Sequence, residues 1–362
     1  MGIENDILEE FNKYKELCKK PNILLAGATG VGKSTLINKI FGENVADVGK
    51  GKPVTINIQK YEQDNLGVVL YDSPGYEIGS EKAFQFEEDV INIKSSIHLV
   101  WYCIDSSKSR VIDFDINAIK KFISNGLEVS ILFTKSDMSS EDDINKLKEA
   151  TNSIVNIDTY TISSKSELHL FKEELYRLIL NSIKKLPKAL KTSFISAQRI
   201  SLKEKWDKSH IMIAQHSISA FAVGFIPIPL SDAPILIVNQ MTMVARILYI
   251  YGLNSFEDMV VGGGIIGQIV SVLGKTAVGG ILKLIPGVGT LVGGLINGSV
   301  ASLITISLGE ATNISSYKLY ESILNGNKDI DKQIELFGEN ILKYAKMYMD
   351  NNKKSNDYKP PK

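Results

Sequence analysis

The sequence of 362 residues is poor in cysteine and histidine and has no excess of charge of either sign. Its two cysteines, Cys18 and Cys103, lie far apart, which predicts reduced thiols in a reducing compartment rather than a disulfide framework. The four histidines do not cluster with cysteines or carboxylates, so we expect no zinc site. Lys plus Arg and Asp plus Glu both number 41, so the chain lacks the basic excess that is typical of nucleic-acid-binding proteins.

The first residues also lack the features of a targeting segment. They are acidic, where a secretory signal peptide carries a basic stretch followed by an apolar one. Gly2 is present, but Asp6 stands where a myristoylation signal requires Ser or Thr. We therefore expect a cytoplasmic protein.

The glycine-rich stretch Gly27-Ala-Thr-Gly-Val-Gly-Lys-Ser34 is the clearest functional motif of the chain. It fits the pattern GxxxxGK(S/T), in which backbone N–H groups and a helix N-terminus hold a polyphosphate. Residues 22–26 precede it as an apolar run of strand length, and residues 35–41 follow it with helical spacing. In this pattern Lys33 reaches the β- and γ-phosphates and Ser34 coordinates Mg²⁺. The motif therefore predicts a site for a nucleoside triphosphate with its metal.

A second motif follows further along the chain. Residues 66–71 form an apolar run that leads into Asp72-Ser-Pro-Gly75. After a phosphate loop, this DxxG pattern predicts that Asp72 holds Mg²⁺ through water and that the N–H of Gly75 senses the γ-phosphate.

Apolar runs alternate with helical patterns through the first half of the chain, which predicts a mostly parallel sheet with helices on both faces. The further predicted strands are residues 97–104, 129–133 and 157–162, and the predicted helices are residues 110–124 and 167–186. In such α/β folds the ligand lies beyond the carboxyl ends of the strands, which is where the motifs fall.

The segments GATGVGKS, Thr55, DSPG, TKSD and SSK resemble, in this order, the five guanine-nucleotide motifs of Ras- and Era-like (TRAFAC-class) GTPases over residues 22–186. The resemblance implies that Asp137 pairs with the N1 and N2 hydrogens of guanine and that Lys135 lies along the base. It also implies GTP and GDP as ligands and Mg²⁺ as the metal. Without the resemblance, the spacing supports only a Mg²⁺-dependent NTPase.

The resemblance assigns a role to each matching position. The implied nucleotide-binding residues are Gly27, Thr29, Gly30, Val31, Gly32, Lys33, Ser34, Thr35, Thr134, Lys135, Asp137, Ser163, Ser164 and Lys165. The implied metal-binding residues are Ser34, Thr55 and Asp72, and the implied catalytic residues are Lys33, Thr55 and Gly75.

The sequence departs from the family pattern at several of these positions. Thr134 replaces the usual Asn, and Ser163-Ser164-Lys165 replaces the usual Ser-Ala-Lys, which are mild changes. Tyr76 stands where Ras-like proteins carry the glutamine that orients the attacking water, and a phenol cannot orient water as that amide does. Gly30 stands where potassium-activated relatives carry an asparagine. We therefore expect slow intrinsic hydrolysis, completed by a partner or by dimerisation.

The composition changes after the predicted GTPase domain. Residues 209–231 and 284–309 carry no Asp, Glu, Lys or Arg, and 13 of the 28 glycines lie between Gly262 and Gly309. Over residues 192–325 the chain resembles the YcjF-type helical domain that is often fused to Era-like GTPase domains, and the helical half of immunity-related, dynamin-like GTPases. This resemblance implies an all-α, glycine-rich hydrophobic domain.

The predicted organisation has four parts. They are an amphipathic helix at residues 1–20, a GTPase domain at residues 21–186, a helical domain at residues 187–350 and a flexible basic tail at residues 351–362. Within the helical domain, residues 190–209 predict one charged helix and residues 327–350 a last helix. Residues 284–309 are long enough to span a bilayer but only moderately apolar. Both a compact soluble bundle and a bundle that opens to touch or enter a membrane are therefore open.

We interpret the chain as a GTP-binding protein that hydrolyses GTP to GDP and phosphate, a switch that drives a helical effector domain toward a membrane surface or self-association. One alternative is an Era-like GTPase in ribosome or RNA assembly, which the balanced charge disfavours. Another is a GTP-gated interaction module with negligible turnover. The expected partners are a guanine nucleotide, a second copy of the chain and a membrane surface that the cytoplasmic protein contacts conditionally; nucleic acid is not expected.

Overall fold

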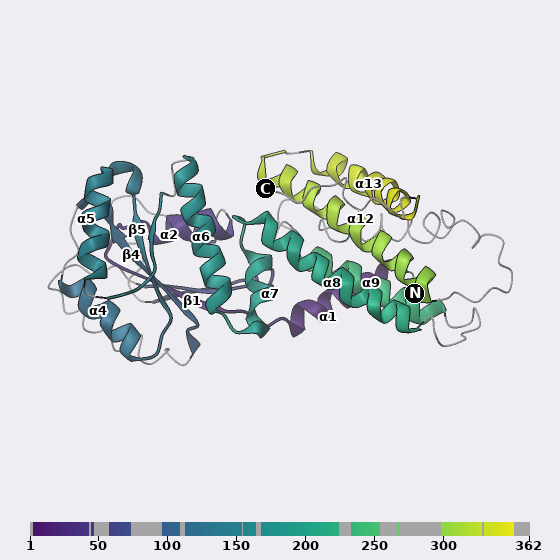
Figure 1. Cartoon of the computed structure of the whole chain (residues 1–362), viewed down its shortest axis with the longest axis horizontal. Coiled ribbons are helices and arrows are strands. Elements are labelled where there is room, and N and C mark those ends of the chain that lie inside the picture. Colours follow the sequence, from purple (N-terminus) through teal and green to yellow (C-terminus); the bar gives the residue numbers. More distant parts are fainter. Residues whose placement is uncertain are drawn as a thin grey trace. The chain divides into compact units, whose positions relative to one another are not determined.

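The computed structural model divides the chain into two compact units, residues 19–201 and residues 1–18 with 202–362 (Figure 1). We call them the nucleotide unit and the helical unit. The structure describes residues 3–42, 45–46, 58–73, 96–108, 113–153, 155–163, 168–223, 233–253, 267, 298–327 and 329–350.

The nucleotide unit is built on a six-stranded sheet with the order β2-β3-β1-β4-β5-β6. Its strands are β1 (Asn22–Ala26), β2 (Gln59–Glu62), β3 (Val69–Asp72), β4 (Leu99–Asp105), β5 (Val129–Thr134) and β6 (Thr159–Thr161). Neighbouring strands are parallel except for the β2–β3 pair. Every residue of β4 is buried, because helices cover both faces of the sheet and leave no solvated side for polar residues. The predicted α/β fold with a mostly parallel sheet is confirmed.

Helices pack on the two faces of this sheet, and the pleat of β1 shows how the faces are divided. The helices are α2 (Lys33–Phe41), α4 (Asp113–Ser124), α5 (Glu141–Asn152), α6 (His169–Lys185) and α7 (Lys188–Ala197). Leu25 joins the core beneath α2, α6 and α7, whereas its neighbour Leu24 joins the core beneath α4 and α5. Successive strand side chains point to opposite faces, so one apolar strand serves both cores.

The prediction of a single charged helix over residues 190–209 was wrong. The chain forms α7 and then α8 (Leu202–Val223), with a break between them. The buried Gln198 side chain accounts for the break: its Oε1 accepts hydrogen bonds from the N–H groups of Ile200 (2.8 Å) and Ser201 (2.7 Å), and its Nε2 donates to the carbonyl of Ser201 (2.8 Å). This side chain satisfies the peptide groups that a continuous helix would have paired.

Helix α7 lies in the core of the nucleotide unit although it follows the composition change at Pro187. Phe194 is fully buried there, and its ring meets Phe41 edge-on at 6.3 Å and Trp101 at 6.5 Å. The unit therefore extends to Ser201.

The helical unit contains α1 (Ile3–Leu17), α8, α9 (Ala233–Ile250), α12 (Gly298–Leu324) and α13 (Ile330–Asp350) among its described residues. Helix α12 packs against α8, α9 and α13, so it is buried on most sides and its sequence shows no amphipathic stripe. A Cβ on Gly309 would lie 2.8 Å from Cγ1 of Ile213 and 3.0 Å from Sδ of Met243, so a glycine permits the close approach of α12 to α8 and α9.

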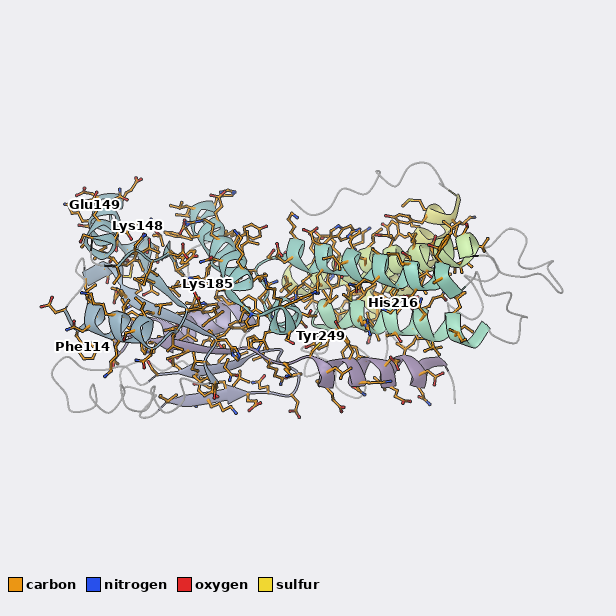
Figure 2. The ribbon with its side chains drawn as sticks, turned by 60° about the horizontal axis from the view of Figure 1, so that its bottom comes forward. Phe114, Lys148, Glu149, Lys185, His216 and Tyr249 are labelled. Atoms are coloured by element: carbon orange, nitrogen blue, oxygen red, sulfur yellow. The ribbon has the colours of Figure 1, made fainter. Side chains whose placement is uncertain are left out.

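Helix α1 packs on α9. Phe11 and Tyr14 both meet the ring of Tyr249, which Figure 2 labels, and Oγ1 of Thr242 donates a hydrogen bond to Glu10.

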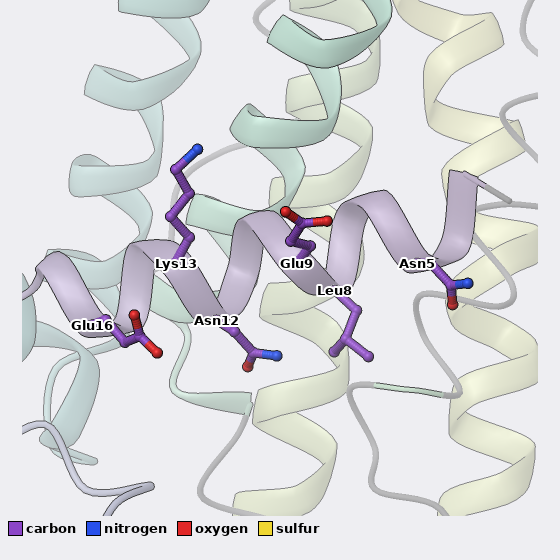
Figure 3. Close-up of a pocket in the computed structure, with 6 residues that line it drawn as sticks. All are labelled: Asn5, Leu8, Glu9, Asn12, Lys13 and Glu16. Carbon is purple, nitrogen blue, oxygen red and sulfur yellow. The ribbon is translucent and has the colours of Figure 1, made fainter. Parts of the chain in front are cut away.

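The outer face of α1 borders a shallow hollow (Figure 3). The hollow is lined by Asn5, Leu8, Glu9, Asn12, Lys13 and Glu16. Its lining is that of an ordinary solvated helix face, with charges of both signs.

None of the described helices is both long enough and apolar enough to cross a membrane. The predicted uncharged stretch at residues 284–309 enters the described structure only from Gly298 onward, as the first turns of α12.

Candidate nucleotide site

The phosphate loop joins the end of β1 to the start of α2, and two of its glycines are required by its geometry. Gly27 has φ +136°, and a Cβ there would lie only 2.2 Å from the carbonyl oxygen of Cys103 on the adjacent β4. Gly32 caps α2 with φ +99°, a backbone conformation that residues other than glycine rarely adopt. The loop can therefore turn sharply enough to direct its N–H groups and the α2 N-terminus toward one point.

Lys33 lies inside this loop and is nearly buried. Its Nζ donates hydrogen bonds to the carbonyls of Gly27 (2.9 Å) and Ala28 (3.3 Å). Burial lowers the pKa of Lys33, while the charge of Asp72 opposes this effect. The two carbonyls are neutral dipoles and compensate the ammonium charge only in part, whereas a polyphosphate would compensate it fully. The loop therefore favours an anion beside Lys33.

Ser34 and Asp72 meet beside the loop. Oγ of Ser34 donates a 2.9 Å hydrogen bond to Oδ2 of Asp72, whereas the buried Oδ1 of Asp72 has no hydrogen-bond partner among the described residues. Burial raises the pKa of Asp72, and the Lys33 charge and the Ser34 hydroxyl offset part of that increase. A buried carboxylate oxygen without a partner is rare and fits a place where a cation or its bound water completes the coordination.

These residues fit Mg²⁺. No group of three His, Cys, Asp or Glu that could hold a metal occurs in the described part of the chain. Mg²⁺ usually takes one or two protein ligands, several waters and substrate phosphates, so Ser34 and Asp72 suit it.

The TKSD segment is tied directly to the phosphate loop. Oγ1 of Thr134 donates a 2.7 Å hydrogen bond to the carbonyl of Val31, so the threonine links β5 to the loop. The N–H of Ser136 donates to the carbonyl of Ile162 at the end of β6 (3.1 Å). Asp137 lies in the 3₁₀ turn Ser136–Met138, and its side chain is exposed, so its carboxylate is open to a ligand.

A polar cluster that sequence reasoning missed lies at the end of β4. Oδ2 of Asp105 accepts a 2.7 Å bond from Nζ of Lys135, and Oδ1 accepts from the N–H (3.1 Å) and Oγ (2.6 Å) of Ser107. Burial acts to raise the pKa of Asp105, but the bonds from Lys135 and Ser107 outweigh it and hold the pKa below its usual value. Oγ of Ser106 donates to the carbonyl of Thr134 (2.8 Å). No sequence motif marks this cluster, because it forms only when β4 pairs with β5, with Asp105 and Thr134 as partners in register.

The predicted residues that the structure describes gather at the carboxyl ends of the parallel strands. These are residues 27–35 after β1, Asp72 at the end of β3, Thr134 at the end of β5 with Lys135 and Asp137 just after it, and the buried Ser163 after β6. Thr55, Gly75, Tyr76, Ser164 and Lys165 lie outside the described residues. The thiol of Cys103 beside the loop is inert, because burial raises its pKa to about 12.

Comparison with known proteins identifies relatives of the nucleotide unit. Residues 22–135 match a protein-family model described as "50S ribosome-binding GTPase". A probable GTP-binding protein EngB of Cytophaga hutchinsonii is 31% identical over 150 residues, which cover 38% of this chain and 72% of that protein. The EngB of Aquifex aeolicus is 27% identical over 166 residues, covering 44% of this chain and 90% of that protein. A crystal structure of a probable GTP-binding protein EngB shares 20% identity with a TM-score of 0.34, covering 46% of this chain and 99% of that one.

Proposed function

We propose a function from the premise that this chain belongs to the family of P-loop GTP-binding proteins that includes EngB. The chain is therefore a GTP-binding protein and a GTPase. Beyond this, we propose that the nucleotide bound to the first unit controls the helical unit, which acts as an effector through self-association or contact with a membrane surface.

At the nucleotide, each described group has a separate task. The loop N–H groups and Lys33 hold the β- and γ-phosphates, and the carboxylate of Asp137 accepts hydrogen bonds from the guanine base. Bound Mg²⁺, held by Ser34 and by Asp72 through water, would neutralise charge on the phosphates. Thr55 and Gly75, which lie outside the described residues, sense the γ-phosphate in this proposal.

Hydrolysis by the isolated protein is slow in this proposal. Tyr76 stands at the place of the water-orienting glutamine, and a phenol does not replace that amide. The missing group comes from a partner or a second copy of the chain, so turnover per molecule rises with protein concentration. A concentration-independent turnover would contradict this part of the proposal.

The outer face of α8 is the observation that supports an effector role. Lys208 is the last charged residue of α8, and residues 209–223 carry none. On this uncharged part Ile211, Ile218 and Phe221 remain 51%, 69% and 41% exposed. Burying three such half-exposed side chains yields roughly 2–4 kcal/mol for one copy of the chain, because full burial of a large apolar side chain is worth about 1.5–3 kcal/mol. A symmetric dimer buries both sets, which yields roughly 4–8 kcal/mol.

Even the gain of a dimer reaches only the lower part of the cost of association, which is about 4–15 kcal/mol. The α8 face alone therefore does not hold a permanent dimer or a permanent membrane contact. A face of this strength suits an interaction that needs a second contribution, which the GTP state would supply.

Two measurements test the proposal. They are light scattering after gel filtration and co-sedimentation with anionic liposomes, each made with GDP and with a non-hydrolysable GTP analogue. We expect a larger mass or liposome binding with the GTP analogue alone. Ile218→Glu should abolish that response. Leu342→Glu is the matched control, because Leu342 is also an exposed apolar residue of the helical unit but lies on α13. An identical monomeric, liposome-free state with both nucleotides would refute the effector role.

A second candidate follows from the description of the matching family, a GTPase that binds the 50S ribosomal subunit. The balanced charge of this chain does not favour it. Co-sedimentation with 50S subunits at low and physiological salt distinguishes this candidate: binding that survives physiological salt with the GTP analogue would favour it. A third candidate, a GTP-gated interaction module, would bind GTP with turnover near zero even at high protein concentration.

A further inference from the structure

Asp105 is not among the predicted nucleotide-binding residues, yet one of its carboxylate oxygens is bonded to Lys135, which is. It is the last residue of β4 and is only 5% exposed. One carboxylate oxygen accepts from the Lys135 ammonium, and the other accepts two bonds from Ser107. Ser107 thus fixes the rotamer of Asp105, and Asp105 fixes the ammonium of Lys135.

Lys135 itself has an unusual backbone. Its φ of +55° is the only positive φ outside glycine in the described residues. A lysine does not adopt the left-handed region by preference, so the surroundings must hold it there, and such outliers concentrate at functional sites. The carbonyl of the preceding Thr134 is bonded to Ser106, and the N–H of the following Ser136 is bonded to Ile162.

We propose that Asp105 is a positioning residue for the nucleobase: it anchors the Lys135 ammonium so that the methylene stem of Lys135 forms a fixed apolar wall for a planar purine ring. The inference rests on the proposed guanine-nucleotide binding at this end of the sheet. An unanchored surface lysine would lose side-chain freedom each time the base binds, and anchoring removes that cost beforehand.

This role predicts a specific kinetic effect. Loss of a pre-organising contact weakens ground-state and transition-state binding alike, so it raises KM and leaves kcat unchanged. It acts mainly on how long the nucleotide stays bound. Asp105→Asn keeps the size of the side chain and an oxygen for Ser107 but removes the charge that holds Lys135.

The test measures dissociation of a fluorescent GDP by stopped flow, together with KM and kcat for GTP. We expect Asp105→Asn to raise the dissociation rate and KM about tenfold, with kcat unchanged. Asp115→Asn is the matched control, because Asp115 is a second buried aspartate of the nucleotide unit, bonded to the hydroxyl of Tyr102 at 2.9 Å on α4. The control should stay within twofold of the wild type in both measurements.

A double-mutant cycle separates positioning from a general structural role. In a Lys135→Met background, which keeps an apolar stem but has no ammonium, Asp105→Asn should cause no further increase in dissociation rate. An equal increase in both backgrounds would show that Asp105 does not act through Lys135 and would overturn the inference. An unchanged or tighter binding of GDP by Asp105→Asn alone would overturn it as well. If the wild type binds no guanine nucleotide, the proposed function fails together with the inference, whereas the other two outcomes leave the proposed function standing.

Discussion

Two glycines of the nucleotide unit share a positive φ but differ in their surroundings, which allows backbone strain to be separated from steric exclusion. At Gly126 (φ +78°) an added Cβ meets nothing within 4 Å. Gly126→Ala should therefore cost only the left-handed backbone, about 1–2 kcal/mol. At Gly27 (φ +136°) the added Cβ would lie 2.2 Å from the Cys103 carbonyl oxygen. That atom belongs to β4, which is paired with β1 on one side and β5 on the other, so it cannot move aside without disturbing the sheet.

Gly27→Ala should therefore carry a second cost. Overpacking of about 1–3 kcal/mol adds to a backbone cost of about 1–3 kcal/mol, for a total of roughly 2–6 kcal/mol. In a unit of this size 1 kcal/mol lowers Tm by about 2–4 °C. We expect Gly126→Ala to lower Tm by about 2–8 °C and Gly27→Ala by about 4–24 °C. The Gly27 variant should also lose the rise in Tm that GTP with Mg²⁺ gives the wild type, because its phosphate loop is displaced.

Tryptophan fluorescence provides the assay. The chain has two tryptophans, Trp101 in the core of the nucleotide unit and Trp206 in that of the helical unit. In a Trp206→Phe background, thermal melting followed by fluorescence reports the nucleotide unit alone. The reasoning is refuted if the Gly27 variant melts within 2 °C of the Gly126 variant and keeps the full GTP-induced rise.

Three further predictions concern charged groups. Asp137→Asn should change the base preference from GTP to xanthosine triphosphate in thermal-shift titrations, because the amide presents a hydrogen-bond donor where the carboxylate accepts. Equal responses of the wild type to GTP and ATP would refute the guanine assignment. Asp72→Asn should raise Tm of the nucleotide-free protein at pH 7, because the raised pKa of the buried carboxyl means that its charged form destabilises the fold above the usual titration range of an aspartate. The same variant should bind Mg²⁺ with GTP more weakly. A lower Tm of the nucleotide-free variant would contradict this. The two histidines of α8 should give opposite pH effects. The Glu310 carboxylate raises the pKa of His210 against the effect of burial, so His210 stabilises the fold below about pH 6.5 and loses that contribution as pH rises. Burial lowers the pKa of His216, so His216 stabilises the fold at higher pH and loses its contribution on acidification. Accordingly, His216→Gln should reduce the fall in Tm between pH 7.5 and 5.5 and His210→Gln should increase it, and the same change in both variants would refute the assignment.

Most of the sheet could be predicted from the sequence because its signals are local. The run at residues 97–104 is apolar throughout since β4 is covered on both faces, and that burial can be read from composition alone. The phosphate loop could be placed because its glycines and Lys33 stand at fixed spacing between a strand and a helix. The position of the site at the carboxyl ends of the strands then followed from topology.

Features that depend on contacts between distant residues could not be predicted in the same way. The break between α7 and α8 depends on the buried Gln198 side chain bonding to peptide groups, and glutamine is otherwise a good helix former. Asp105 gives no motif, because its role arises only when β4 and β5 pair and bring it to Lys135. Helix α12 carries buried polar residues such as Thr312 and Asn313, so its pattern did not indicate which face is inside.

The route of the chain between its two units bears on how a nucleotide could control the helical unit. The chain passes between the units at residues 18–19 and again at residues 201–202. The first passage leads within a few residues into β1, the strand that ends in the phosphate loop. The second follows Arg199, whose N–H donates a 2.8 Å hydrogen bond to the carbonyl of Ile40 in the last turn of α2, the helix that the loop begins.

Both covalent connections to the helical unit are thus anchored on the strand and the helix that flank the phosphate loop. A joint shift of β1 and α2 on exchange of GDP for GTP would move both connections together. Coupling of two sites requires a physical element whose arrangement both of them bias. The β1–loop–α2 segment is continuous with the first connection through β1 and is hydrogen-bonded to the second through Ile40 of α2. Its loop is where the nucleotide would bind, so this segment is the element through which the proposed switch would act.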